Sequence, residues 1–267
     1  MKKAVLFAVP GTTTPGADAA YRNIERCAAA RFPGVGVRWV FTSSVVRRKR
    51  AAAGRAALSP AQTLAAMRAE GFTHVVVQPL QFVAGAEFGE VAEGTRRFRS
   101  GVDAFERLLL GRPLLETAGQ FARAAAVLLE DTPAADVGID ALVLAAHGSR
   151  QPAAADAFER AGAECTRLDK PVFVATLTSA PGIDDVAARC REAGVRKVCL
   201  VPFMVVGGRS ARNEIGGPGP GSFRTRLERQ GIACEPVLAG LGEYDRIADI
   251  WLDQVESLWR TVSEDET

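Results

Sequence analysis

A single histidine stands where an imidazole could take part in acid–base or metal chemistry. His147 directly follows an apolar run, residues 141–146, and precedes Gly148 and Ser149. This order predicts an imidazole at the carboxyl end of a buried strand, beside a helix start, with Gly148 permitting a tight turn. Because an imidazole changes protonation near neutral pH, it can be a base or a metal ligand. We predict both roles for His147; the alternative is an incidental histidine at a helix-capping junction.

A carboxylate occupies a similar place earlier in the chain. Glu87 follows an apolar segment that ends VAG, within the sequence AGAEFGEVAEG. It could accept protons, or it could be the acidic residue that favours the positive N-terminal end of the next helix. The sequence leaves both readings open. Glu90 and Glu93 lie further along the same predicted helix, and we expect them on its solvated face.

A cationic run, residues 47–50 (RRKR), follows the segment FTSS. Such a run is usually the solvated face of a helix. Its position after a strand end would also direct positive charge toward a ligand cleft and attract a polyanionic small molecule. Nucleic acid is not expected as a partner, because 33 basic and 31 acidic residues leave a net charge of only +2, and no aromatic residues interleave with the run.

The glycine-rich segment GGPGPG, residues 216–221, excludes a helix and predicts a mobile or ligand-covering loop. It matches neither the phosphate-binding pattern GxxxxGK[ST] nor the dinucleotide pattern GxGxxG. The GxSxG elbow of serine hydrolases is also missing from the sequence. Nucleotide binding and serine-hydrolase chemistry therefore have no support in the motifs.

Strands and helices alternate along the chain. Short, continuous apolar runs predict strands buried on both faces of a parallel sheet, at residues 4–9, 35–41, 73–79, 141–146, 172–177 and 197–202. Helices are predicted between them, at residues 18–30, 61–69, 119–129, 153–168 and 184–193. His74, near the start of the third strand, is expected to be a surface residue or a satisfied edge residue. This alternation is typical of an open α/β fold.

The two halves of the chain resemble each other. FTHVVVQPLQFVAG (72–85) matches VRKVCLVPFMVVGG (195–208) at an offset of 123 residues, and RPLLE (112–116) matches EPVLA (235–239) at the same offset. FTSS (41–44) matches LTSA (177–180) at 136, and the segment 10–12 matches 147–149 at 137. Four collinear matches indicate duplication of one α/β unit.

The duplication predicts two similar α/β halves, residues 1–131 and 132–267, each a parallel sheet flanked by helices, with a ligand cleft between them. Open α/β folds bind ligands beyond the carboxyl ends of their strands. The loop after each third strand, carrying Glu87 in one half and Arg209 and Ser210 in the other, is expected to face this cleft. The loop that carries His147 is expected to face it as well.

The composition is that of an ordinary globular protein: 267 residues, 48% hydrophobic and 24% charged, with a mean hydropathy of +0.05. Five scattered cysteines form no CxxC pair, which favours a reducing compartment. The apolar run near the start is better read as a strand than as a signal peptide, and no run reaches the roughly 18 residues that span a bilayer. We expect a cytoplasmic protein without a membrane partner.

The segments KKAVLFAVPGTT, VFTSSVVRRK, VVVQPLQFVAGAEF, LAAHGS, VPFMVVGG followed by RNE, and GLGEY occur in this order. Together they resemble the anaerobic-type sirohydrochlorin cobaltochelatases, within the class II chelatases that include ferrochelatase. The resemblance covers roughly residues 2–258. It implies two flavodoxin-like halves with a tetrapyrrole bound between them. It also implies ATP-independent insertion of Co²⁺, the metal substrate, into sirohydrochlorin for cobalamin biosynthesis, with no cofactor required.

The resemblance also implies site residues. His147 falls on the family's first catalytic and metal-binding histidine, and Glu87 on the cleft glutamate of the first half. Tetrapyrrole contacts are expected from the loops at the strand ends, namely Gly11, Thr12, Thr42, Ser43, Arg47, Gly85, Arg209 and Ser210. A homo-oligomer is possible under this reading.

Two positions depart from the family pattern. Ser210 follows Arg209 where the family has a second metal-binding histidine, and Thr178 replaces a glutamate ligand. A transition ion usually needs three or four N, O or S ligands, and a guanidinium repels cations. A tetrapyrrole-binding or haem-binding carrier, with His147 as axial ligand, is therefore a second hypothesis. A periplasmic-type binding module is a third, against which the motif set argues.

Overall fold

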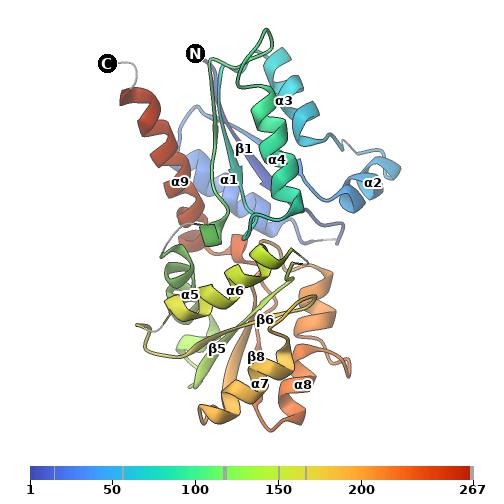
Figure 1. Ribbon diagram of the computed structural model, residues 1–267, viewed down its shortest axis with the longest axis vertical. Helices are drawn as coiled ribbons and strands as arrows, with labels where there is room; N and C mark the ends of the chain where they lie inside the picture. The colour runs from blue at the N-terminus through green and yellow to red at the C-terminus, as the bar shows by residue number, and fades with distance from the viewer. Residues whose placement is uncertain (15, 56, 117–118, 150, 166, 265–267) are drawn as a thin grey trace. The chain divides into compact units, whose positions relative to one another are not determined.

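The computed structural model describes residues 1–14, 16–55, 57–116, 119–149, 151–165 and 167–264 (Figure 1). The chain forms two compact units. The first contains residues 1–15, 21–116 and 248–267, and the second contains residues 16–20 and 117–247. The sequence analysis expected one division after residue 131. In the structure the division falls earlier, and the C-terminal helix from Ala248 onward belongs to the first unit.

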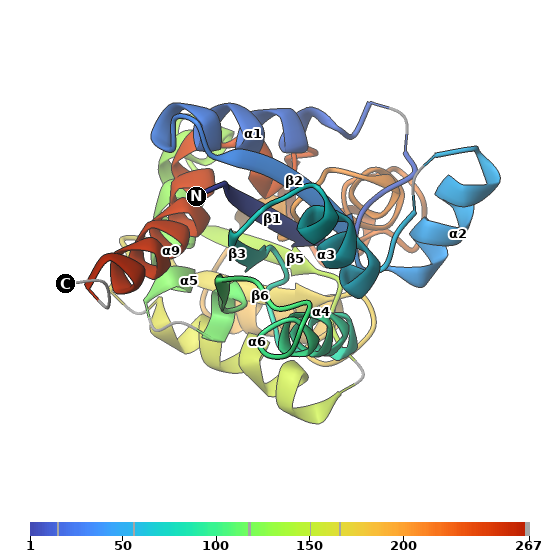
Figure 2. The same cartoon turned by 90° about the horizontal axis from the view of Figure 1, so that it is seen from above.

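The first unit is built on a four-stranded parallel sheet in the order β2-β1-β3-β4. Its strands are β1 (Lys3–Val9), β2 (Gly36–Phe41), β3 (His74–Pro79) and β4 (Arg107–Leu110). Figure 2 shows β1 between β2 and β3. All six residues of β3 are buried, as expected for a central strand covered on both faces.

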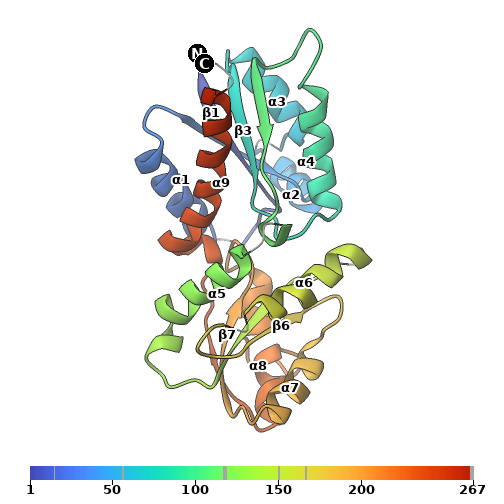
Figure 3. The same cartoon turned by 60° about the vertical axis from the view of Figure 1, so that its left-hand side comes forward.

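Helices cover both faces of this sheet. They are α1 (Ala19–Arg31), α2 (Ser44–Ala52), α3 (Pro60–Ala69), α4 (Ala86–Arg97) and α9 (Asp245–Glu264), of which α9 begins in the second unit. Figure 3 shows α1 and α9 on one side and α3 and α4 on the other. Alternate residues of β1 point to opposite faces: Leu6 joins Leu64 of α3 and Val91 of α4 in one hydrophobic cluster.

The second unit repeats the arrangement with the sheet order β6-β5-β7-β8. Its strands are β5 (Ala141–Ala146), β6 (Val172–Thr176), β7 (Lys197–Pro202) and β8 (Ala233–Pro236). The helices α7 (Ile183–Glu192) and α8 (Phe223–Arg229) pack one face, where Val143, Val186 and Leu227 share a cluster. The helices α5 (Gln120–Asp131) and α6 (Pro152–Glu164) complete the unit (Figure 1).

The duplication predicted from the sequence is confirmed by the identical strand order of the two sheets. The pairing registers correct two of the matched segments. Val9 pairs with Phe41 and Ala146 with Thr176, so the second strands correspond at an offset of 135 rather than 136. By the same reasoning Arg107 corresponds to Ala233, an offset of 126 rather than 123. Sequence similarity located the repeats, and the hydrogen-bonded register fixed the equivalent residues.

All six predicted strands and all five predicted helices are present, with ends displaced by up to four residues. The sequence analysis placed no elements at β4, β8, α8 or α9. The edge strands β4 and β8 have only four residues each and are mostly half-exposed, so neither gives a continuous buried apolar run. Within the described ranges, no helix combines the length and the apolar character needed to cross a bilayer.

Candidate functional site

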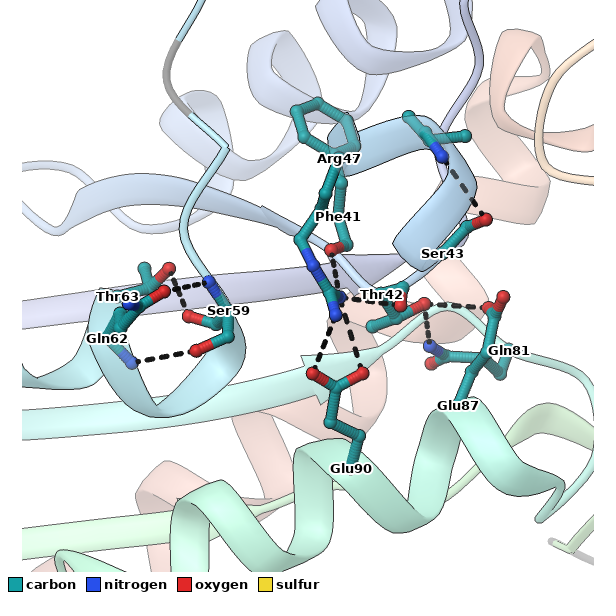
Figure 4. A network of polar contacts seen from close by, with 11 residues as sticks. Phe41, Thr42, Ser43, Arg47, Ser59, Gln62, Thr63, Gln81, Glu87 and Glu90 are labelled. Atoms are coloured by element: carbon teal, nitrogen blue, oxygen red, sulfur yellow. Dashed lines mark hydrogen bonds and ion pairs between the residues drawn. The ribbon is translucent and has the colours of Figure 1, made fainter. Parts of the chain in front are cut away.

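Glu87 lies in the first turn of α4 and is held by a buried polar pair (Figure 4). The hydroxyl of Thr42, directly after β2, donates to Oε2 of Glu87 at 2.7 Å. The side-chain amide of Gln81, just after β3, donates to the same Thr42 oxygen at 3.1 Å. Thr42 is 1% exposed and Gln81 7% exposed. Two strand ends, those of β2 and β3, therefore supply the polar pair that holds this carboxylate.

Arg47 of α2 is bound inside the protein (Figure 4). Its guanidinium donates to the carbonyls of Phe41 and Thr42, at 2.9 and 2.6 Å, and forms an ion pair with Glu90 at 2.8 Å. Its side chain is only 16% exposed. Glu90, expected on the solvated face, is instead the partner of Arg47. Within the cationic run, Arg47 therefore anchors α2, which itself contributes no buried residue.

The other predicted site residues of the first unit determine the backbone conformation of the loops in which they lie. Gly11 has φ +89°, and a Cβ there would lie 2.6 Å from the ring of Phe41, so the turn after β1 requires glycine. Thr12 accepts the Thr14 amide at 3.1 Å. Ser43 is the N-cap of α2 and Gly85 that of α4. Their contact with a tetrapyrrole stays a prediction, as it does for Thr42, whose hydroxyl is buried.

His147 lies directly after β5 with its side chain exposed. The backbone beneath it is fixed, because its carbonyl accepts both the amide and the hydroxyl of Thr178, at 3.1 and 2.8 Å. Gly148 follows with φ +85°, and a Cβ there would lie 2.7 Å from Oγ of Ser179. The loop therefore holds an accessible imidazole on a rigid turn, an arrangement suited to a base or a metal ligand.

Arg209 and Ser210 precede a π-helix, η3 (Ala211–Ile215), in which Ser210 is the N-cap residue. Arg209 is exposed and Ser210 half-buried. Short π-helical turns occur frequently at functional sites. This turn begins three residues after Gly208, at the strand-end loop that the sequence analysis singled out.

The glycine-rich segment lines a cavity of about 380 Å³ within the second unit. The lining residues are Leu177, Asn213, Glu214, Gly219, Gly221, Ser222, Phe223 and Arg226. At its start the segment lies close to the backbone of η3, because a Cβ on Gly217 would lie 2.5 Å from the carbonyl of Arg212. At its end it is held by a hydrogen bond, which the buried Ser222 hydroxyl donates to the Gly217 carbonyl at 2.6 Å.

The other titratable groups of the described residues are not arranged for metal binding. Among the described residues, no group of three or more His, Cys, Asp or Glu side chains could hold a metal ion. His74 is buried at the start of β3, with Nδ1 2.9 Å from the Thr73 hydroxyl and 3.6 Å from Glu106. It therefore has polar partners, but the expected surface or edge position is wrong, because β3 lies between β1 and β4. Burial raises the pKa of Cys165 and Cys190 to about 11 and that of Cys234 to about 12.

Gln81 is the site residue that sequence reasoning missed. It follows β3 within the apolar segment PLQFVAG. A single amide in such a segment predicts a buried polar side chain, which needs a hydrogen-bond partner. Its partner, Thr42, is 39 residues away in sequence.

The fold is that of metal chelatases. SirB from Bacillus subtilis with Fe³⁺ matches with a TM-score of 0.64 at 16% identity, over 96% of this chain and 95% of that one. CbiX, described as the terminal enzyme for biosynthesis of siroheme in denitrifying bacteria, matches with a TM-score of 0.58 at 15% identity, over 96% and 99%.

The sequence gives the particular family. The family model "Cobalt chelatase (CbiK)" matches residues 3–259, and the chain belongs to this family of enzymes. Sirohydrochlorin cobaltochelatase CbiKC of Nitratidesulfovibrio vulgaris is 37% identical over 254 residues, 95% of this chain and 89% of that protein. Sirohydrochlorin cobaltochelatase of Salmonella typhimurium is 31% identical over 247 residues, 91% of each chain. The resemblance noted from the sequence motifs is confirmed.

Proposed function

We propose that this protein inserts Co²⁺ into sirohydrochlorin without ATP, as a step in cobalamin-type tetrapyrrole biosynthesis. The observation that carries the proposal is its 37% identity, over 95% of its length, to a sirohydrochlorin cobaltochelatase. An exposed imidazole and a fixed carboxylate at strand ends agree with this activity. The cytoplasmic location and the homo-oligomer stay predictions.

The reaction requires a base and a ligand. Two pyrrole N–H protons leave the macrocycle as Co²⁺ sheds water and gains four nitrogen ligands, so charge balances as one divalent ion replaces two protons. In the proposal, His147 binds the ion before its transfer to the macrocycle and accepts a proton, since its imidazole is exposed on a fixed loop. Glu87 accepts a proton through its half-buried carboxylate.

The substrate's carboxylates need cationic partners. Arg209 is exposed two residues before the π-helical turn, and a guanidinium binds a carboxylate through paired hydrogen bonds. Arg48 and Lys49 are exposed on α2. Because Arg47 is occupied by Glu90 and two carbonyls, we assign it the role of holding α2 in place, and we assign carboxylate binding to its neighbours.

The two departures from the family pattern affect metal binding. Ser210 offers one hydroxyl where the family has an imidazole, and the hydroxyl of Thr178 already donates to the carbonyl of His147. His147 is therefore the principal ligand in the proposal, and Co²⁺ is bound weakly until the macrocycle nitrogens complete its shell. The same two positions favour the second candidate, a tetrapyrrole or haem carrier that does not catalyse insertion.

One assay separates the two functions. Purified protein is mixed with sirohydrochlorin and Co²⁺ without ATP, and the absorbance of the macrocycle is followed, with Ni²⁺ and Fe²⁺ in parallel. Multiple turnovers above the uncatalysed rate, lost in His147→Ala, support the chelatase. Stoichiometric binding of sirohydrochlorin or haem without turnover identifies the carrier and overturns the proposal.

A further inference from the structure

The two repeats place different residues at the same three positions. Strand register and loop hydrogen bonds make equivalent Thr42 and Leu177, Gln81 and Met204, and Glu87 and Ser210. The polar set Thr42, Gln81 and Glu87, which we call the first-repeat triad, thus corresponds to two apolar residues and a serine. Comparing the two repeats therefore shows which features of the loops depend on these polar side chains.

The backbone hydrogen bonds that lead up to the three positions are the same in both repeats. The amides of Thr42 and Leu177 donate to the last residue of the neighbouring strand, at 2.8 and 3.1 Å. The Gln81 and Met204 carbonyls accept from Leu114 and Leu241, at 3.1 and 2.8 Å. Just before the third position both repeats have the same tight turn. The Gly85 amide donates to the Val83 carbonyl in the first repeat, and the Gly208 amide donates to the Val206 carbonyl in the second, each at 2.9 Å.

The loops therefore do not need the polar side chains in order to fold. Burying a hydroxyl and an amide costs free energy where one of their polar atoms is left without a partner, as Oε1 of Gln81 is among the described residues. In the second repeat Leu177 and Met204 avoid this cost and pack against the hydrophobic cluster of the sheet. A polar pair that destabilises the core relative to its apolar counterpart points to a role outside folding.

We propose that Thr42 and Gln81 are positioning residues that hold the Glu87 carboxylate in the orientation needed for metal insertion. The inference rests on the proposed role of Glu87. Because the Gln81 amide donates to Oγ1 of Thr42, the single hydroxyl proton of Thr42 is directed to Oε2 of Glu87. The fixed Oε2 sets the direction of Oε1, which the inference assigns to the proton that leaves the tetrapyrrole.

The test is a double-mutant cycle on the intact protein. Thr42→Val removes the hydroxyl at nearly constant volume, Glu87→Gln removes the carboxylate, and the two are combined. In Co²⁺ insertion into sirohydrochlorin, we expect Thr42→Val to lower kcat about tenfold, with KM for sirohydrochlorin within about twofold of wild type. Thr42→Ser, which keeps the hydroxyl, should restore most of kcat. The double variant should be no slower than Glu87→Gln alone.

Thr95→Val is the matched control. Thr95 is a buried threonine of α4 whose hydroxyl donates to the Val91 carbonyl at 2.8 Å, so the variant makes the same change away from Glu87. Its kcat should stay at the wild-type value. Gln81→Met, which copies the second repeat, should lower kcat by a smaller factor than Thr42→Val, and it supports the inference even if Thr42→Val fails to fold.

The outcomes separate the inference from the function on which it rests. If Glu87→Gln lowers kcat while Thr42→Val and Gln81→Met do not, the positioning role is overturned and the role of Glu87 stands. If the losses from Thr42→Val and Glu87→Gln multiply in the double variant, Thr42 acts independently of Glu87 and the inference is wrong. If Glu87→Gln inserts Co²⁺ at the wild-type rate, the role of Glu87 fails, and the inference fails with it.

Discussion

Pro10 and His147 occupy the same position in the two repeats. Each follows the last residue of the first strand of its sheet, and each carbonyl accepts an equivalent amide, that of Ser43 at 3.3 Å and that of Thr178 at 3.1 Å. Each is followed by a glycine with positive φ, +89° at Gly11 and +85° at Gly148. The loop thus forms around a residue without a polar side chain in one repeat and around an exposed imidazole in the other.

This equivalence predicts that His147 contributes to activity and not to stability. We expect His147→Ala to abolish Co²⁺ insertion and to change the free energy of unfolding by less than about 0.5 kcal/mol, as for other exposed positions. Insertion assays and urea denaturation measure the two quantities. A variant that is strongly destabilised, or that still turns over, would contradict the prediction.

Restoring the missing ligands should strengthen metal binding. We expect Ser210→His combined with Thr178→Glu to raise Co²⁺ affinity about tenfold or more, because the change adds an imidazole and a carboxylate to the ligand set. Arg209 opposes this gain by charge repulsion, so Arg209→Asp in the same background should raise affinity further. Isothermal titration with Co²⁺ is the measurement. Tight binding by the unmodified protein, lost in His147→Ala, would show that other side chains already complete the shell.

Gly148 should not tolerate a side chain. An alanine would have to adopt φ +85° and place Cβ 2.7 Å from Oγ of Ser179. We expect Gly148→Ala to lower the free energy of unfolding by about 2 kcal/mol or more. Gly138→Ala is the control, because Gly138 has φ +61° and a Cβ there would meet no atom within 4 Å, so only the backbone cost remains, roughly 1 kcal/mol. Equal losses in the two variants would show that the contact with Ser179 has no energetic effect.

An ion network joins α1 to α9 in the first unit and should make stability depend on pH. Arg31 pairs with Asp249 at 3.7 Å, with Asp253 at 2.5 Å and with Glu256. Hydrogen bonds from Arg31, and then from Arg260, lower the pKa of Glu256 below its usual 4.5. A carboxyl group with a lowered pKa stabilises the folded state above about pH 4.5, and this contribution is lost as the pH falls through the folded-state value.

We therefore expect Arg31→Met to lower Tm at pH 7 and to have a smaller effect near pH 3, where a larger fraction of the carboxyl groups is protonated. Thermal denaturation followed by circular dichroism at both pH values is the measurement. Arg96→Met is the control, because Arg96 pairs with Glu93 in the same helix, and both side chains are largely exposed; its effect on Tm should be small at either pH. A Tm loss for Arg31→Met that is the same at pH 3 and pH 7 would exclude the ionic contribution.

The sequence alone determined the local elements and the repeat. A strand buried on both faces must be continuously apolar, and this is why β1, β3, β5 and β7 could be recognised from composition. Two copies of one unit keep similar strand ends, so the position of His147 before a glycine turn could be predicted, as could the position of Glu87 after the third strand. These properties depend on residues that are neighbours in the sequence.

Only the tertiary structure decided which residues hold the carboxylate, which strands form the edges and where the last helix packs. Thr42 reaches Glu87 across 45 positions of sequence, and Arg31 reaches Glu256 across 225. The edge strands β4 and β8 are set by pairing with β3 and β7 and not by their own hydrophobicity. Hydrogen-bond partners and burial depend on which segments the folded chain brings together, and no pattern within a single segment encodes that choice.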